Sequence, residues 1–239
     1  MEISELYKIY QKHPNVSIDS RNVKENSIFF SLKGPNFDGN KYAKKAISNG
    51  AKYAIVNDKK LAAKNNFIFF EDTLKVLQTL ANFHRRKLKI PIIAITGTNG
   101  KTTSKELIKE CLGTQINTAY TKGNLNNHIG VPLTLLEIKL SDNVAIIEMG
   151  ANHPKEIKEL CNIAEPNYGI ITNIGLAHLE GFKSIDGVKK TKKELYDYIK
   201  SKNGKIFVNS DDKVLNEISS GIEKISYGLK GNISGKIDS

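Results

Sequence analysis

The chain has 239 residues, of which 39% are hydrophobic and 26% are charged. This composition is typical of a folded globular protein with one large domain or two smaller ones, and it excludes an intrinsically disordered chain. No apolar run approaches the roughly 20 residues that a membrane-spanning helix needs. The first residues, MEISELYKIYQKH, lack the apolar core of a secretory signal. We therefore expect a cytoplasmic protein with no membrane association.

The formal net charge of +11 raises the question of a nucleic-acid partner. All but three of the 36 basic residues are lysines, and they are scattered among acidic residues. Base recognition relies heavily on arginine, so we expect no nucleic-acid partner but a solvated, lysine-rich surface, part of which faces an anionic small substrate. Cys111 and Cys161 lie in expected helices without CxxC spacing, so we expect both to pack in the core.

Short helical and strand-like segments alternate before residue 90. Helical spacing predicts helices over residues 2–12 and 41–50, and short apolar runs predict strands over 27–32, 52–57 and 66–70. Asp72 and Thr73 then offer N-caps to a helix that ends in the basic stretch HRRKLK. We expect a domain boundary near residues 88–90.

Three strand–loop–helix units follow Pro91. Their strands are IIAIT, NVAIIEM and YGIITNI, and the last is followed by a polar loop and a helix near 186–200. Continuous apolar strands between amphipathic helices predict a parallel sheet covered on both faces. We therefore expect an α/β protein with a small mixed domain over 1–88 and a mainly parallel-sheet, P-loop ATPase-like domain over 89–239. Function in such sheets gathers at the carboxyl ends of the strands.

The strongest motif is the glycine-rich segment TGTNGKTT, Thr96–Thr103, between the first of these strands and its helix. A phosphate site needs glycines, a helix N-terminus, a lysine and a hydroxyl group for Mg²⁺, and all four are present. Ile95 stands where the common P-loop pattern has its first glycine, so the loop is a variant. We expect Lys101 to bridge the β- and γ-phosphates and Thr102 to coordinate the metal. The alternative is a glycine-rich turn with an incidental lysine.

Two residues near the ends of later strands could support the metal. Glu148 follows the strand VAII and is placed to bind Mg²⁺ or a metal-bound water, and His178 follows the next strand in IITNIGLAH. Each residue alone is more often a structural polar group. Their combination with the phosphate loop favours the metal interpretation.

Two polar segments stay open on pattern alone. The amides of Asn124, Asn126 and Asn127 could build turns or could bind a ligand. Arg21 could clamp a phosphate or could simply pair with Asp19.

Together, the segments TGTNGKTT, GNLNNHIGVPLTLL, EMGANHPKEI, TNIGLAHLEGF and KKTKKEL resemble the Mur ligases, and the similarity covers essentially the whole chain. EMGANHP is similar to the branch of the family that adds D-alanyl-D-alanine (D-Ala-D-Ala) to UDP-N-acetylmuramoyl-tripeptide (UDP-MurNAc-tripeptide). The resemblance implies a monomeric enzyme of peptidoglycan precursor synthesis. It implies ATP-dependent amide formation through an acyl phosphate, with ATP and two Mg²⁺ ions as cofactors.

The resemblance also implies roles for individual residues. The ATP-binding residues would be Gly97, Thr98, Asn99, Gly100, Lys101, Thr102 and Thr103, with Asn209 near the adenine. The metal ligands would be Thr102, Glu148, His178 and Lys192, and the catalytic residues would be Lys101, His178 and Lys192. The UDP moiety would contact Ser20, Arg21, Lys33, Gly34, Asp38 and Gly39, and Asn124, Asn126 and Asn127 would line the central cleft.

The expected chemical role of Lys192 comes from the resemblance and not from the residues around it. It implies that Lys192 is carbamylated and that the carbamate supports the second metal. From the residues alone, Lys192 lies on the apolar stripe of its helix, and we would expect its side chain to extend to solvent like those of Lys189, Lys190 and Lys193.

Four residues depart from the family pattern. Lys155 stands where a glycine is usual after HP, Lys183 interrupts the usual GFGS, Lys193 replaces the glycine of KGE, and Asn40 replaces a common histidine. We expect these changes to affect loop shape and substrate contacts more than the chemistry.

The resemblance implies a further C-terminal domain that closes over ATP and the incoming dipeptide, and we expect the sequence to end before that domain. The 239-residue chain alone is therefore expected to be inactive in ligation. Two other functions stay open: a sister ligase that adds a single amino acid, and a non-catalytic module that binds a nucleotide or a UDP-sugar.

Overall fold

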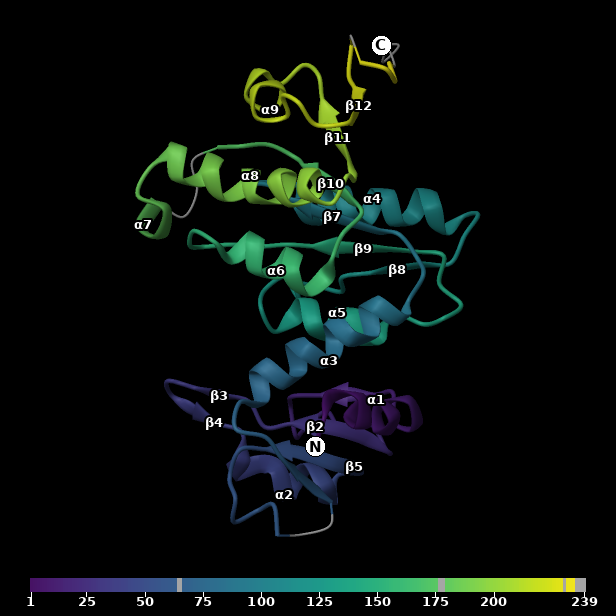
Figure 1. Cartoon of the computed structure of the whole chain (residues 1–239), viewed down its shortest axis with the longest axis vertical. Coiled ribbons are helices and arrows are strands. Elements are labelled where there is room, and N and C mark those ends of the chain that lie inside the picture. The colour runs from purple at the N-terminus through teal and green to yellow at the C-terminus, as the bar shows by residue number, and fades with distance from the viewer. Residues whose placement is uncertain (64–65, 176–178, 230, 235–239) are drawn as a thin grey trace. The chain divides into compact units, whose positions relative to one another are not determined.

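The computed structural model describes residues 1–63, 66–175, 179–229 and 231–234, and the chain divides into two compact α/β units (Figure 1). Unit 1 comprises residues 1–87 together with 135–137, and unit 2 comprises residues 88–134 and 138–239. The expected α/β class with mainly parallel sheets is confirmed. Within the described residues, no helix combines the length and the apolar character that crossing a bilayer requires.

Unit 1 is built on a four-stranded parallel sheet with the strand order β1-β2-β5-β6. Its elements in chain order are α1 (Ile3–Lys12), β1 (Val16–Ser17), β2 (Ser27–Phe30), β3 (Lys33–Gly34), β4 (Phe37–Asp38), α2 (Asn40–Ser48), β5 (Ala51–Val56), β6 (Phe67–Phe69) and α3 (Thr73–Lys87). Strands β3 and β4 form a separate antiparallel hairpin. All helices and strands expected before residue 90 are found. Where bounds were expected, the observed first and last residues of each element lie within two residues of them.

The core of unit 1 follows from the side-chain alternation of β2, whose four residues are all buried. Phe29 packs with Ala43 and Ala46 of α2 on one face of the sheet. Successive strand residues point to opposite faces, so Ile28 and Phe30 face the other side. Figure 1 shows α1 and α3 on that side. The sheet is thus covered on both faces, as parallel sheets require.

Unit 2 contains a six-stranded parallel sheet with the order β12-β11-β10-β7-β9-β8. The remaining elements are β7 (Ile92–Thr96), α4 (Lys101–Gly113), β8 (Thr118–Tyr120), α5 (Gly130–Glu137), β9 (Val144–Glu148), α6 (Glu156–Ala164), β10 (Tyr168–Ile171), α7 (Leu179–Phe182), α8 (Ile185–Ser201), β11 (Lys205–Asn209), α9 (Lys213–Ile218) and β12 (Lys224–Tyr227). The three expected strand–loop–helix units are β7–α4, β9–α6 and β10–α8.

The strand order places a topological switch point at β7. The chain runs through β8 and β9 on one side of β7, and then through β10, β11 and β12 on the other. The connections leaving β7 and its neighbours therefore diverge, and they leave a crevice beyond the carboxyl end of β7. The glycine-rich loop begins at that position.

Helices α4 and α8 lie on opposite faces of this sheet. Ile170 belongs to a buried cluster that packs against Ile108 of α4. The preceding residue, Gly169, points the other way, and a Cβ atom there would lie 3.2 Å from Leu195 and Ile199 of α8. The absence of a side chain at Gly169 therefore lets α8 pack closely against the sheet.

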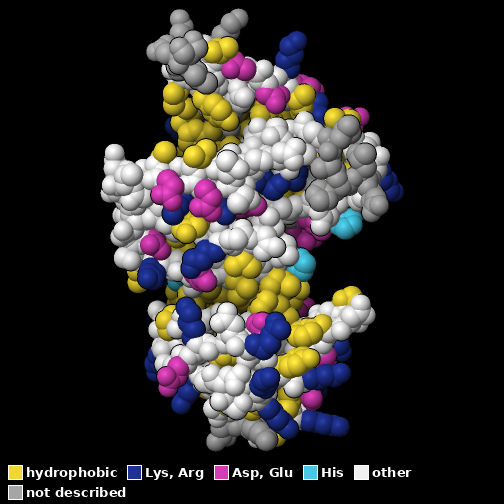
Figure 2. Space-filling model, turned by 180° about the vertical axis from the view of Figure 1, so that it is seen from behind, with side chains coloured by type: hydrophobic (Ala, Val, Ile, Leu, Met, Phe, Trp, Pro, Cys, Tyr) yellow, Lys and Arg dark blue, Asp and Glu magenta, His cyan; other side chains and the backbone are white. Residues whose placement is uncertain are grey.

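Two expectations about the surface have different outcomes. On the face drawn in Figure 2, lysine and arginine side chains are scattered over both units with acidic side chains among them, as expected. The expectation that both cysteines pack in the core is wrong for Cys111, which is exposed, whereas Cys161 is buried. Burial raises the pKa of the Cys161 thiol. The Cys111 side chain is exposed on helix α4. The apolar residues near it in the sequence do not determine which side of the helix faces the sheet.

Candidate functional site

A pocket of about 380 Å³ lies in unit 2 beyond the carboxyl ends of β7 and β9. Its lining comes from the glycine-rich loop, from the loops before α5 and α6, and from helices α6, α7 and α8. The lining residues are Gly97, Thr98, Lys101, Asn126, Asn127, His128, Gly150, Ala151, Asn152, Glu156, Glu159, Leu160, Phe182, Val188 and Lys192. The position agrees with the switch-point rule for ligand sites in open parallel sheets.

Two glycines give the glycine-rich loop its shape. Gly100 immediately precedes α4 and has φ of 75°, a left-handed conformation that glycine adopts without strain. A Cβ atom at Gly97 would lie 1.9 Å from the Thr172 Oγ1 atom, so no larger residue fits there. The loop can therefore turn directly into α4 and leave the first backbone N–H groups of the helix free to bind an anion.

Lys101, the first residue of α4, folds back over this loop. Its Nζ atom donates hydrogen bonds to the carbonyl oxygens of Gly97 (2.8 Å) and Thr98 (3.1 Å). Burial lowers the pKa of Lys101, and the nearby Glu148 carboxylate opposes that shift. The ammonium group is thus held at the loop, where phosphate oxygens would replace the carbonyls as acceptors.

Two residues after β10, Thr172 and Asn173, hold the glycine-rich loop in place, and neither was expected at the site. The Thr98 N–H donates to the Asn173 backbone oxygen (3.1 Å), and the Asn99 N–H donates to the Asn173 side-chain oxygen (3.1 Å). The Thr172 hydroxyl donates to the Asn99 carbonyl (2.6 Å). The signal in the sequence was the polar pair after the apolar strand YGII, at the end where parallel neighbours meet.

The Glu148 carboxylate brings three expected site residues together. Its Oε2 atom accepts a hydrogen bond from the Thr102 hydroxyl (3.0 Å), and its Oε1 atom accepts one from the Asn126 amide (2.8 Å). Glu148 is 1% exposed. The carboxylate and hydroxyl oxygens are hard donors of the type that Mg²⁺ takes beside water and phosphate oxygens, so these residues fit that ion. Within the described part of the chain, no group of three His, Cys, Asp or Glu side chains could hold a metal ion.

A second lysine of α4, Lys105, also faces Glu148. It is fully buried, with its Nζ atom 3.7 Å from Glu148 Oε2 and 3.2 Å from Glu106 Oε1. Lys105 was not expected at the site, because the sequence KTTSKELIKE resembles the other lysine-rich surface helices. Its spacing of four residues from Lys101 was the available signal, since that spacing puts both side chains on one face of the helix.

Lys192 lies on the pocket-facing side of α8. It is 3% exposed, and its Nζ atom is 5.9 Å from the centre of the Phe182 ring. The pKa of Lys192 is lowered to about 8, first by burial and then by Lys101, while Glu156 and Glu194 oppose the shift. The side chain points inward, as its place on the apolar stripe of α8 allows, and it does not extend to solvent as we would expect of a lysine without the family resemblance.

Other residues expected at this site lie elsewhere or have structural contacts. Asn127 lines the pocket, but its side-chain oxygen accepts from the Ile129 and Gly130 N–H groups at the start of α5. The Asn209 side chain accepts from the Asp211 N–H (3.0 Å). The described residues of the expected site that do not line the pocket are Asn99, Gly100, Thr102, Thr103, Asn124, Glu148 and Asn209. His178 lies outside the described residues.

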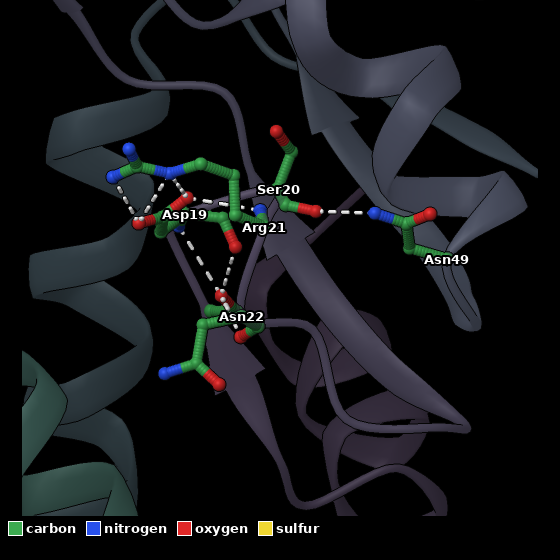
Figure 3. Close-up of polar contacts among 6 residues, drawn as sticks. Asp19, Ser20, Arg21, Asn22 and Asn49 are labelled. Atoms are coloured by element: carbon green, nitrogen blue, oxygen red, sulfur yellow. Dashed lines mark hydrogen bonds and ion pairs between the residues drawn. The ribbon is translucent and has the colours of Figure 1, made fainter.

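In unit 1, Arg21 pairs with Asp19, which was one of the two alternatives for this arginine (Figure 3). The guanidinium Nη2 atom is 2.7 Å from Asp19 Oδ2, and Nε also donates to the carboxylate. The arginine side chain is 81% exposed, so a ligand can still reach its outer edge. Hydrogen bonds from Arg21 lower the pKa of Asp19 to about 2.

The other expected UDP contacts in unit 1 form a local polar framework. The Ser20 carbonyl accepts from the Asn49 amide (2.7 Å), as Figure 3 shows. Asp38 accepts from the backbone and the side chain of Asn40, which lowers the pKa of the Asp38 carboxyl. A Cβ atom at Gly39 would lie 2.6 Å from the Leu32 oxygen. The two remaining residues, Lys33 and Gly34, are exposed in the hairpin.

Comparison with protein families identifies two regions of the chain. The model for the Mur ligase middle domain matches residues 95–238, more than half of the chain, and the model described as the Mur ligase family catalytic domain matches residues 13–85. The relatives that match include two proteins named UDP-N-acetylmuramoyl-tripeptide–D-alanyl-D-alanine ligase. The protein from Haemophilus influenzae is 38% identical over 82% of this chain and 44% of its own length. That from Bacillus subtilis is 35% identical over 85% of this chain and 45% of its own length.

Solved structures agree with the sequence comparison. MurF from Acinetobacter baumannii matches with a TM-score of 0.83 and 31% identity over 97% of this chain and 54% of that chain. MurF ligase from Thermotoga maritima in complex with ADP matches with a TM-score of 0.82 and 28% identity over 94% of this chain and 52% of that chain. The chain thus spans about half the length of the relatives it matches. The resemblance seen in the sequence is confirmed: the chain belongs to the Mur ligase family, and MurF is the type it resembles.

Proposed function

We propose that this chain provides the nucleotide-binding and UDP-substrate-binding parts of an ATP-dependent ligase that joins D-Ala-D-Ala to UDP-MurNAc-tripeptide. The observation that carries the proposal is the cluster in which Thr102 and Asn126 hold Glu148 beside the glycine-rich loop. The names of the MurF relatives support the substrates. The ADP bound to the Thermotoga maritima structure supports the nucleotide.

The loop residues supply the binding and positioning that phosphoryl transfer needs. Backbone N–H groups at the start of α4 would hold the phosphates, and Lys101 would neutralise the β- and γ-phosphate charge. Thr102 and Glu148 would hold Mg²⁺, which supplies charge neutralisation at the transferring phosphoryl group. The tripeptide carboxylate would accept the γ-phosphoryl group, and the D-Ala-D-Ala amine would then displace phosphate. Asn126 would line the cleft where that exchange takes place.

Lys192 is proposed to carry a carbamate that supports a second metal ion, together with Glu148 and His178. An ammonium group would repel the metal, whereas a carbamate offers anionic oxygen atoms. Carbamylation joins the neutral amine to carbon dioxide with loss of a proton. Burial in the pocket supports this proposal, as does the pKa lowered to about 8, because both increase the neutral fraction of the amine.

Unit 1 is proposed to receive the UDP moiety. Arg21 and Lys33 present exposed cationic side chains, and cations of this type bind diphosphates. The framework around Ser20, Asp38 and Gly39 holds the adjoining backbone in place.

Nucleotide binding tests the first half of the proposal. ATP with Mg²⁺ should bind the 239-residue chain weakly in a calorimetric titration, and Lys101→Ala should weaken that binding further, by at least about tenfold, because a charge-assisted contact is lost. The matched control is Lys109→Ala on the same helix, because Lys109 pairs with the surface residue Glu110 and is absent from the pocket lining. Loss of binding in both variants, or no binding by the unmodified chain, would contradict the proposal.

Ligation is tested with a longer protein in which this chain is extended by the C-terminal domain that the family resemblance implies. Phosphate release should require both UDP-MurNAc-tripeptide and D-Ala-D-Ala. Release with a single amino acid and not with the dipeptide would indicate the sister activity. Lys192→Ala should remove most ligation, and short carboxylates added in excess should restore part of it. Unchanged activity in that variant would exclude the carbamate.

A further inference from the structure

Lys105 places a positive charge inside unit 2, next to the oxygen pair formed by Thr102 and Glu148. It lies on α4 and is fully buried. Its Nζ atom donates no hydrogen bond within the described residues, and it is 5.9 Å from the centre of the Tyr120 ring. A buried ammonium without hydrogen bonds is costly, so it depends on the carboxylates near it.

Two carboxylates lie within ion-pairing distance of Lys105, and they differ in exposure. Glu106 lies at 3.2 Å, but its side chain is 46% exposed, so solvent screens its charge. Glu148 lies at 3.7 Å with a side chain that is only 2% exposed. Its interaction with the lysine is therefore screened much less, and Lys105 balances the Glu148 charge.

The remaining contacts of Glu148 do not restore a negative potential. The Thr102 hydroxyl and the Asn126 amide are both neutral hydrogen-bond donors. Lys101 is near enough for Glu148 to oppose the lowering of its pKa by burial, so a second ammonium group, held at the Gly97 and Thr98 carbonyl oxygens, adds positive charge near the carboxylate. A divalent cation that approached the two oxygen atoms would meet one carboxylate and two ammonium groups. It would be repelled unless a ligand brought further negative charge.

We propose that Lys105 is a positioning residue that prevents the Thr102–Glu148 oxygen pair from binding a divalent cation alone, so that the cation binds only with an anionic polyphosphate. The inference rests on the proposed nucleotide site and adds an order of binding to it. Lys105 orients Glu148 through its charge. A nucleotide triphosphate then supplies the negative charge that the bare pair lacks.

Direct measurement of Mn²⁺ binding tests this role. Free Mn²⁺ is followed by its electron paramagnetic resonance signal while it is added to the 239-residue chain without nucleotide. The unmodified chain should show no saturable binding in the millimolar range. Lys105→Met is one atom shorter and has a similar helix propensity, but it removes the charge, and it should tighten Mn²⁺ binding by at least about tenfold.

The control is Lys109→Met, one helical turn further along α4. Lys109 also faces the Tyr120 ring, at 5.0 Å, but it pairs with the exposed Glu110. This variant removes an equal charge from the same helix at the surface and should leave Mn²⁺ binding unchanged. An equal gain in both variants would overturn the proposal, because a general reduction of positive charge would then explain it.

A double variant separates the charge balance from a folding defect. Lys105→Met with Glu148→Gln removes both buried charges and should fold, as judged by circular dichroism, without gaining Mn²⁺ affinity. If the double variant gains the affinity that Lys105→Met gains, the cation is bound elsewhere and the proposal fails. Saturable Mn²⁺ binding by the unmodified chain without nucleotide would overturn it without any variant.

Addition of ATP distinguishes this inference from the proposed function. With ATP, the unmodified chain should bind Mn²⁺, and the gain in affinity caused by ATP should be larger than in Lys105→Met. If ATP binds but the Lys105→Met variant shows no gain without it, the Lys105 inference fails and the nucleotide site stands. If ATP does not bind the unmodified chain, the proposed function fails, and this inference, which rests on it, fails too.

Discussion

Asp19 and Arg21 form an exposed pair whose electrostatics can be tested at a single carboxyl group. Hydrogen bonds from Arg21 lower the pKa of Asp19 to about 2. In Arg21→Ala the Asp19 pKa should rise towards the usual value of about 3.9, as measured by NMR titration of the side chain. Because the folded-state pKa is the lower one, the pair stabilises the fold above pH of about 4 and this contribution is lost as the pH falls through about 2. An unchanged Asp19 pKa would show that another group holds the carboxylate.

The site residues that could be predicted are those fixed by local sequence. Lys101 and Thr102 follow a glycine turn between a strand and a helix, and Glu148 ends a strand, so their positions follow from the chain near them. Lys105 and Lys192 could not be placed in this way from the residues alone. Both sit in helices rich in lysine, and which lysine is buried depends on the sheet face against which each helix packs.

Helix α6 begins at a left-handed residue that is not glycine. Lys155 has φ of 74°, a conformation that costs an L-residue roughly 1 kcal/mol. Lys155→Gly should therefore raise the free energy of unfolding by a few tenths to about 1 kcal/mol, because relief of strain exceeds the added freedom of the unfolded chain. Urea denaturation measures the change.

Lys193 is the matched control, because it also stands where the family pattern has glycine. It lies inside α8, and it forms an ion pair with Asp197. Lys193→Gly should lower the free energy of unfolding by about 1 kcal/mol, the cost of glycine in a helix interior. Equal effects of the two variants, in either direction, would show that backbone conformation does not decide the outcome.

Glu194 joins the start of α6 to α8. Its carboxylate accepts hydrogen bonds from the N–H groups of Lys155 (2.8 Å) and Lys158 (2.9 Å), at the positive end of the α6 dipole. Glu194→Ala should lower the free energy of unfolding by about 1–2 kcal/mol. Asp197→Ala, on the same helix, removes only an exposed ion pair and should change it by less than about 1 kcal/mol. A smaller effect of Glu194→Ala than of Asp197→Ala in urea denaturation would contradict this capping role.

At the scale of elements, apolar spacing and apolar runs decided what could be predicted. Helices α1, α3, α4 and α8 span several turns, so their apolar spacing is repeated often enough to be recognised. The short strands β2 and β6 were still predicted, because each lies in an apolar run. The strands β8 and β12 contain no buried residue and lie in no such run, so the sequence does not mark them. The hairpin β3–β4 has only two residues in each strand, too few for a pattern.

At the scale of the whole chain, we propose that unit 2 binds the nucleotide and unit 1 binds the UDP moiety, and hydrogen exchange followed by mass spectrometry can separate the two contacts. ATP with Mg²⁺ should protect the amides of residues 100–103 in unit 2, because the backbone N–H groups at the start of α4 would bind phosphate, whereas those of Thr98 and Asn99 already donate to Asn173. UDP-MurNAc-tripeptide should protect residues 17–22 and 31–40 in unit 1. A segment is protected when a ligand binds to it or when its loop becomes stiffer. Variants of the two proposed sites show which ligand causes the protection of each segment.

One variant in each unit tests the two proposed sites separately. Lys101→Ala should remove the protection by ATP and keep the protection by the UDP compound, whereas Arg21→Ala should do the opposite. Substitutions at sites that share no partner have nearly additive free energies, so each variant should leave the other ligand's affinity within about twofold. Loss of both protections in Arg21→Ala would show that Arg21 supports the fold and does not bind the UDP moiety. Loss of neither in Lys101→Ala would remove the phosphate loop from the proposal, because the lysine that closes over Gly97 and Thr98 would then contribute nothing to nucleotide binding.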